Sequence, residues 1–213
     1  MSRPRVINLG FPKSGTTTLA RALREAGLSV ADFRLRQGAR RGFVGGLMYR
    51  GYFDHGDPLM HFEGVDALTE ISVVRNKRNF WPQCDFGLLQ AIRKKHPEAR
   101  FLLSMRDPAA QADSMMRWSD MGTRRLRVAA IPGLPKEFGS SEAQLVRWIE
   151  GHFAFCHKIF DGSDRFLAYR IEDRTAPEQI SEFLGLELPW WGVANANPPK
   201  PGARDDVLKK GAA

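Results

Sequence analysis

The segment with the clearest chemical potential is residues 10–18, with the sequence GFPKSGTTT. It follows a short apolar stretch and precedes a stretch of helical periodicity that begins at Thr16. Backbone N–H groups at the start of a helix converge on one concave space, and the helix dipole favours negative charge there. We therefore predict that this loop binds a phosphate group. The candidate ligands are Pro12, Lys13, Ser14, Gly15, Thr16, Thr17 and Thr18.

The loop differs in one way from the phosphate loop of ATP- and GTP-binding enzymes, GxxxxGK[ST]. The spacing between Gly10 and Gly15 is the same, but Thr16 follows the second glycine where that motif has lysine. The lysine here is Lys13, two residues before the second glycine, so its charge reaches the anion from another side. A P-loop kinase or NTPase is the leading alternative function, and a plain turn with a threonine helix cap is the structural alternative.

A second candidate anion site follows the most apolar predicted strand, residues 100–105. Arg106 comes at its end, and Ser114 lies eight residues later, within the next predicted helix. Guanidinium groups present a planar fork of donors that suits phosphate. Taken singly, Arg106 could instead form an ion pair with Asp107 or Glu172, and Ser114 could be a small packing residue.

The PKSGTT sequence resembles the phosphate loop of the sulfotransferases that use 3′-phosphoadenosine 5′-phosphosulfate (PAPS), and most of the chain is similar to a compact bacterial branch of them. The resemblance implies that residues 12–18 hold the 5′-phosphosulfate and that Arg106 and Ser114 hold the 3′-phosphate. It implies transfer of a sulfuryl group to a hydroxyl or amine, with PAP as the product and no metal required. Lys13 would stabilise charge on the leaving phosphate.

Such a reaction needs a base for the proton of the acceptor. Glu70 is the first candidate and Asp66 the second, because both match acidic positions in the resembling branch. His61 and Glu63 are weaker alternatives. For Glu70, an exposed carboxylate beside the arginines that follow it is the competing interpretation.

Strand-like and helix-like stretches alternate along the chain, which predicts an α/β fold. We expect a P-loop-containing three-layer fold, with a central parallel sheet flanked by helices, in a single domain over residues 1–213. Residues 34–62 and 120–140, rich in glycine and arginine or in glycine and proline, are predicted to be substrate-side loops. Residues 198–213 are predicted to form a tail or a loop that covers the cofactor.

Composition limits the other function classes. The 213 residues carry a formal charge of +8, which favours an anionic partner. Because no nucleic-acid-binding motif accompanies this charge, we expect a small-molecule, glycan or lipid acceptor and no nucleic acid. A basic protein that binds a nucleotide without catalysis remains an alternative. The sequence does not indicate an oligomeric state.

Two further features concern the location of the protein. No apolar run approaches the roughly 20 residues of a transmembrane helix, and the N-terminus lacks a secretory signal pattern. Cys84 and Cys156 are the only cysteines, which disfavours a disulfide framework or a structural zinc site. We therefore expect a cytoplasmic protein.

Overall fold

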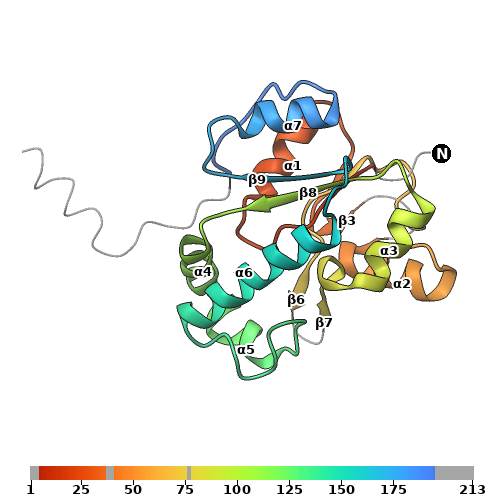
Figure 1. The fold of residues 1–213 in the computed structure, drawn as a ribbon. Coiled ribbons are helices and arrows are strands. Elements are labelled where there is room, and N and C mark those ends of the chain that lie inside the picture. The colour runs from red at the N-terminus through yellow and green to blue at the C-terminus, as the bar shows by residue number, and fades with distance from the viewer. Residues whose placement is uncertain (1–4, 37–40, 76–77, 195–213) are drawn as a thin grey trace, which may run out of the picture.

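The computed structural model describes residues 5–36, 41–75 and 78–194, in which a five-stranded parallel sheet lies between two layers of helices (Figure 1). Every pair of neighbouring strands in this sheet is parallel. The predicted α/β fold class is confirmed. The strands lie in the order β2 (Val30–Ala31), β5 (Ala67–Leu68), β1 (Val6–Asn8), β8 (Arg100–Met105) and β9 (Phe166–Arg170).

The two helical layers bury alternate residues of the strands, as the period of two in a strand requires. On one face, Val6 and Leu102 pack with α1 (Thr16–Glu25) and α7 (Ala176–Leu184). On the other face, Ile7 and Phe101 belong to a core that includes side chains of three further helices. These are α2 (Val44–His55), α3 (Phe86–Lys95) and α6 (Glu142–Ile159). Both faces of the sheet are thus covered, which is typical of parallel sheets.

A smaller core lies beneath the loop that follows β1. Phe11 is fully buried there, and its ring stacks on His152 at 3.8 Å and on Trp148 at 4.2 Å. This core also holds apolar residues of α4 (Pro108–Arg117) and of the chain that follows it, including Met121 and Leu126. Residues 120–140, predicted as a loop, therefore contain a π-helical turn, η2 (Met121–Arg125), and a short helix, α5 (Leu126–Val128).

Residues 34–62 also differ from a simple loop. They contain α2, whose Leu47 and Met48 side chains are buried in the main core. This region also contains a short antiparallel pair, β3 (Arg34–Leu35) with β4 (Gly42–Phe43). A second antiparallel pair follows it, β6 (Val73–Arg75) with β7 (Arg78–Phe80). The turn η1 (Pro82–Cys84) then leads into α3. Of the described residues in 34–62, Phe43 alone lines the large cavity considered below.

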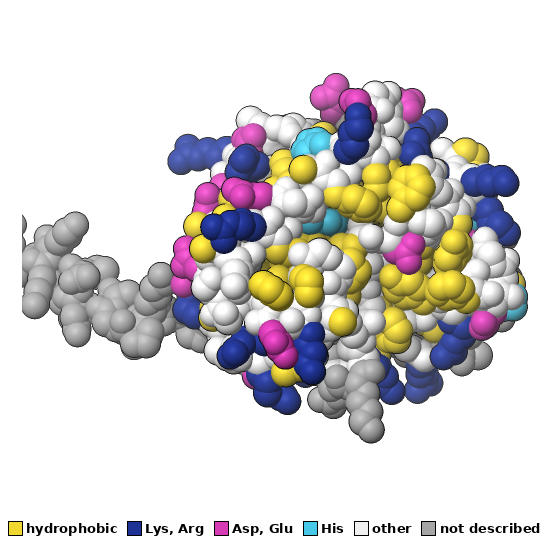
Figure 2. Space-filling model, turned by 60° about the horizontal axis from the view of Figure 1, so that its bottom comes forward, with side chains coloured by type: hydrophobic (Ala, Val, Ile, Leu, Met, Phe, Trp, Pro, Cys, Tyr) yellow, Lys and Arg dark blue, Asp and Glu magenta, His cyan; other side chains and the backbone are white. Residues whose placement is uncertain are grey.

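The surface on the side of the molecule seen in Figure 2 carries Lys and Arg mainly around its edge, with Asp and Glu among them. Its central area is mostly apolar or uncharged, with a histidine and an acidic side chain among the apolar ones. Within the part of the chain that the structure describes, no helix combines the length and apolarity that spanning a bilayer requires.

Candidate active site

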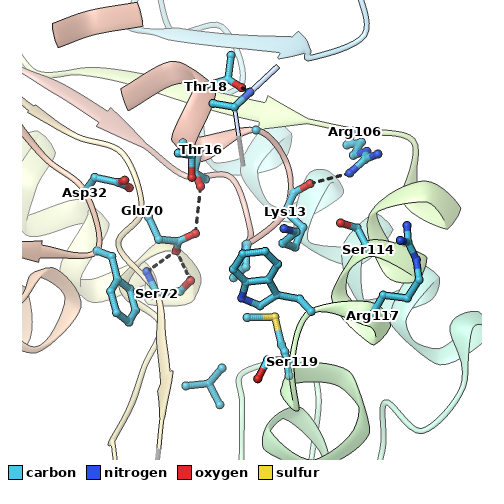
Figure 3. Close-up of a pocket in the computed structure, with 18 of the residues that line it drawn as sticks. Lys13, Thr16, Thr18, Asp32, Glu70, Ser72, Arg106, Ser114, Arg117 and Ser119 are labelled. Carbon is cyan, nitrogen blue, oxygen red and sulfur yellow. Dashed lines mark hydrogen bonds between the residues drawn. The ribbon is translucent and has the colours of Figure 1, made fainter. Parts of the chain in front are cut away.

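The carboxyl ends of the parallel strands open into one cavity of about 1280 Å³, and Figure 3 shows part of its lining. The phosphate-loop candidate follows the central strand β1, whereas Glu70 follows β5 on one side and Arg106 follows β8 on the other. In open α/β sheets, the crevice where connections diverge to both sides of a strand is the usual ligand site. The fold thus brings together segments that are far apart in sequence.

The loop after β1 has the backbone shape that its glycines predict. Gly15 adopts a φ of +95°, and a Cβ atom there would lie 2.6 Å from the side chain of Ile171. Lys13 also has a positive φ, of 69°. Helix α1 begins directly after Gly15, at Thr16, so its first N–H groups lie at the cavity.

Side chains behind the loop hold it in place. The Gln111 amide of α4 donates a hydrogen bond of 3.0 Å to the carbonyl of Pro12. Asn8 donates to the Ser104 hydroxyl at 3.1 Å, and the hydroxyls of Ser14 and Ser104 are 2.8 Å apart. Ser14 is fully buried and is not among the cavity-lining residues, so its side chain supports the loop from behind. Of the predicted phosphate ligands, the other six line the cavity.

The ammonium group of Lys13 lies in a cationic and aromatic environment. Its Nζ is 3.6 Å from the centre of the Trp118 ring, a cation–π contact. Burial and the charges of Arg106 and Arg117 lower the pKa of Lys13 to about 8. This amine therefore keeps its charge at neutral pH but loses it under mildly basic conditions.

Arg106 and Ser114 reach the same cavity, as Figure 3 shows. Arg106 donates a hydrogen bond of 3.4 Å to the carbonyl of Lys13, and its Nε lies 3.7 Å from the Glu172 carboxylate. Ser114 is only 3% exposed and lies on α4, which begins just after Asp107 caps its N-terminus through a 2.8 Å bond to Ala110. The predicted second anion site thus lies next to the first.

Two lining residues near this pair were absent from the sequence prediction. Arg117 lies three residues after Ser114 on α4, about one turn along the helix, and forms a 2.7 Å ion pair with Asp113. Trp118 follows it and carries the Lys13 contact. Helical spacing from Ser114 would have identified Arg117, but no local signal marked Trp118.

Glu70 lies on the opposite side of the loop from Arg106 (Figure 3). Its carboxylate accepts hydrogen bonds from the Thr16 hydroxyl at 3.3 Å, from the Ser72 backbone N–H at 3.0 Å and from the Ser72 hydroxyl. Burial, and secondarily the nearby Asp32 carboxylate, raise the pKa of Glu70 to about 8. The side chain is 9% exposed and lines the cavity, so it is not a freely solvated carboxylate.

The remaining candidates for the base lie elsewhere. Asp66 precedes β5 whereas Glu70 follows it, so the two carboxylates lie at opposite ends of that strand. Asp66 accepts a 2.9 Å hydrogen bond from the Ser29 N–H and does not line the cavity, and neither do His61 and Glu63. Asp32, which follows β2, does line it and was missed; the Thr69 hydroxyl donates to it at 3.2 Å. Of the four predicted candidates for the base, Glu70 alone lines the cavity.

The far wall of the cavity is formed by the β6–β7 hairpin and by η2. Its charged residues are Arg75, Arg78, Asp120, Arg124 and Arg125. The segment at 192–194 closes another edge, where the Ala194 N–H donates to the Thr18 hydroxyl at 3.3 Å. The predicted covering segment, residues 198–213, lies outside the described residues. Within the described ranges, no group of three or more His, Cys, Asp or Glu side chains is placed to hold a metal ion.

Comparison with known proteins gives one family. The family described as "Sulfotransferase domain" matches residues 5–139, which include the phosphate loop, Glu70, Arg106 and Ser114. Among solved structures, a sulfotransferase from Alicyclobacillus acidocaldarius is similar over 99% of this chain and 92% of its own, with 15% identity and a TM-score of 0.48. No curated protein matches. Because the family match spans more than half of the 213 residues, the chain belongs to the sulfotransferase family.

Proposed function

We propose that this protein transfers a sulfuryl group from PAPS to a hydroxyl or amine of an acceptor. The observation that carries the proposal is the placement of Lys13, Arg106 and Ser114 around one cavity with Glu70 on its other side. PAPS is an anion at two places, its 5′-phosphosulfate and its 3′-phosphate. A site with two adjacent groups of anion ligands is suited to such a molecule.

The residues present fit this nucleotide. The backbone N–H groups at the start of α1, the hydroxyls of Thr16 and Thr17 and the ammonium of Lys13 would hold the 5′ end. Arg106 and the Ser114 hydroxyl would hold the 3′-phosphate. Arg117 adds a further positive charge to the same half of the cavity. When bound, PAPS supplies the sulfuryl group and its phosphate is the leaving group.

The roles of the side chains follow from charge and position. Sulfuryl transfer is expected to resemble phosphoryl transfer, so catalysis depends mainly on positioning and on stabilising the charge of the leaving group. Lys13 neutralises that charge. Glu70 in its ionised form takes the proton of the acceptor, and the Thr16 and Ser72 hydrogen bonds orient the carboxylate for this step.

Calorimetric titration with PAP and with ATP tests the nucleotide. ATP has no 3′-phosphate and cannot use the Arg106–Ser114 pair in the same way, so PAP is expected to bind more tightly. Tight binding of ATP without binding of PAP would instead support a P-loop kinase or NTPase. Transfer of ³⁵S from labelled PAPS to an acceptor then distinguishes an enzyme from a protein that only binds the nucleotide.

A further inference from the structure

The hairpin at the far wall of the cavity places two arginines directly opposite each other. In the β6–β7 register, Arg75 pairs with Arg78, and both side chains are exposed and line the cavity. Like charges directly opposite each other in an antiparallel pair destabilise it. Among the described residues, neither arginine forms an ion pair with a carboxylate.

The other arginines of this wall have partners. Arg124 and Arg125 share the carboxylate of Asp120, at 2.5 and 2.7 Å. Arg125 also donates a 3.0 Å hydrogen bond to the carbonyl of Val74, which ties η2 to β6. These contacts hold the wall together, and within the described ranges Arg75 and Arg78 are the two arginines of the wall that lack a carboxylate partner.

An aromatic ring lies beside Arg78, one of the two paired arginines. The guanidinium of Arg78 lies 5.3 Å from the centre of the Phe43 ring, and that of Arg34 lies 4.4 Å from the same ring. Phe43 packs edge-on against Phe33 at 5.1 Å, and both rings line the cavity. A cation–π contact holds a guanidinium near a ring, and its planar fork of donors suits an oxyanion.

The pair belongs to the Glu70 side of the cavity. Arg75 ends the short segment that runs from Glu70 through Ser72 and Val74, all of which line the cavity. The ligands proposed for PAPS come instead from the loop that follows β1, from the start of α1, from the residue that follows β8 and from α4. A molecule that presents a hydroxyl to Glu70 is thus bordered by the arginine pair and by the apolar surfaces of Phe33, Phe43 and Val74.

We propose that the acceptor is a small hydroxyl compound that also carries an oxyanion group, a phosphate, sulfate or carboxylate, and that Arg75 and Arg78 bind this group together. The inference rests on the proposed function, because it assigns the acceptor side of that reaction. An anion between the two guanidiniums relieves their repulsion and positions the acceptor hydroxyl at Glu70.

The first test measures binding without catalysis. With PAP at saturation, chloride is replaced by inorganic phosphate at constant ionic strength and the melting temperature is followed. The wild type is expected to gain thermal stability, and the Arg75→Gln/Arg78→Gln double variant is not. Arg34→Gln is the matched control, since it removes a guanidinium from the same Phe43 ring without removing a cavity-lining residue. An equal gain in wild type and double variant would overturn the proposal.

The second test uses matched acceptors with ³⁵S-labelled PAPS: glucose, glucuronic acid and glucose 6-phosphate, and vesicles with phosphatidylglycerol or with neutral lipid only. The ³⁵S label is expected on the acceptors that carry an anionic group: glucuronic acid, glucose 6-phosphate or phosphatidylglycerol. Label on a sugar would indicate a free metabolite as the acceptor, and label on phosphatidylglycerol would indicate a lipid headgroup. In the double variant, the KM for the anionic acceptor that becomes labelled should rise roughly tenfold to a hundredfold, as loss of a charged hydrogen bond predicts. Label on the neutral members only would contradict the proposal.

The two proposals fail in different ways. If the wild type does not bind PAP, the assignment of the nucleotide is wrong, whatever the arginines do. If PAP binds equally to wild type and double variant but phosphate stabilises both alike, only the assignment of the acceptor is wrong. The double variant is also expected to melt no lower than wild type without phosphate, because the mutation removes a repulsive pair.

Discussion

The hydroxyl of Thr16 donates a hydrogen bond of 3.3 Å to the carboxylate of Glu70, and this contact joins the phosphate loop to the proposed base. Thr16 is the first residue of α1, and Glu70 follows the neighbouring strand β5. An anion bound at the start of α1 therefore lies close to the group that would take the acceptor proton. The contact also makes the state of Glu70 sensitive to what the loop binds.

Replacing Glu70 with Gln is expected to lower the transfer rate by roughly 10²- to 10⁴-fold, the usual contribution of a general base. The variant should still bind PAP, because the amide keeps the shape of the carboxyl group. Calorimetry with PAP and a radiolabel assay measure the two properties separately. Asp66→Asn is the control, since Asp66 lies at the other end of β5, and its rate should stay close to that of wild type. A nearly normal rate in Glu70→Gln would contradict the assignment.

The same substitution should change how stability depends on pH. The pKa of Glu70 is raised from 4.5 to about 8, so the folded state holds a proton that the unfolded state has already lost in this interval. The free energy of unfolding therefore carries a contribution from Glu70 that decreases as pH rises from about 4.5 to about 8. Urea unfolding at several pH values should show a weaker decrease in Glu70→Gln than in wild type. Identical slopes would show that Glu70 titrates normally.

Activity should pass through a maximum near pH 8. Glu70 must lose its proton to act as a base, which occurs as pH rises through about 8. Lys13 must keep its proton to stabilise negative charge, and it loses that proton as pH rises through about 8. The pH profile of kcat/KM reports the free enzyme, so both limbs should be visible in it. Loss of the rising limb in Glu70→Gln, with the falling limb retained, would assign each limb to its residue.

Lys13→Ala and Arg106→Ala should affect different quantities. Removal of the Lys13 ammonium is expected to abolish measurable transfer, because its charge acts mainly on the leaving group. Removal of the Arg106 guanidinium should mainly lower the affinity for PAP, by roughly tenfold to a hundredfold, as expected for loss of a charged hydrogen bond. Single-turnover rates at saturating PAPS and calorimetric affinities for PAP separate the two effects. Near-normal transfer by the Lys13 variant would exclude its assigned role.

Gly15→Ala should disturb the phosphate loop more than the positive φ of residue 15 alone would explain. Gly15 and Gly27 have similar φ angles, +95° and +86°, but only the Cβ atom at Gly15 would meet a neighbour, at 2.6 Å from Ile171. Both alanine variants should lose stability, by about 1 kcal/mol or more for the positive φ. Gly15→Ala should also lose PAP binding, whereas Gly27→Ala should retain it. Thermal unfolding and calorimetry compare the pair directly, and equal PAP affinity would show that the loop tolerates the methyl group.

Those parts of the site that depend on local sequence were predictable. The loop at residues 10–18 carries its own glycine, lysine and threonine pattern, and Arg106 is followed by Asp107 and Pro108, a helix start that the structure confirms. In a parallel sheet, the residues that directly follow each strand all lie at the same edge of the sheet. Knowledge of the strand ends was therefore enough to bring Lys13 and Arg106 together.

The choice between Asp66 and Glu70 shows where sequence alone is insufficient. Strand β5 has only two residues, Ala67 and Leu68, so a pattern of alternation cannot locate its two ends. The sequence ranked Glu70 first but kept Asp66 as the second candidate, and in the structure only Glu70 of the two lines the cavity. Asp32 and Trp118 were missed for a related reason, because their role depends on tertiary contacts rather than on a local motif.

The hydrogen bonds that Asn8, Ser104 and Gln111 make behind the phosphate loop have a kinetic and entropic consequence. They hold the loop in shape with side chains that do not contact the ligand side, so little ordering of the backbone should accompany nucleotide capture. Encounter with the nucleotide should then resemble docking to a rigid surface, with association fast and differences in affinity expressed mainly in residence time.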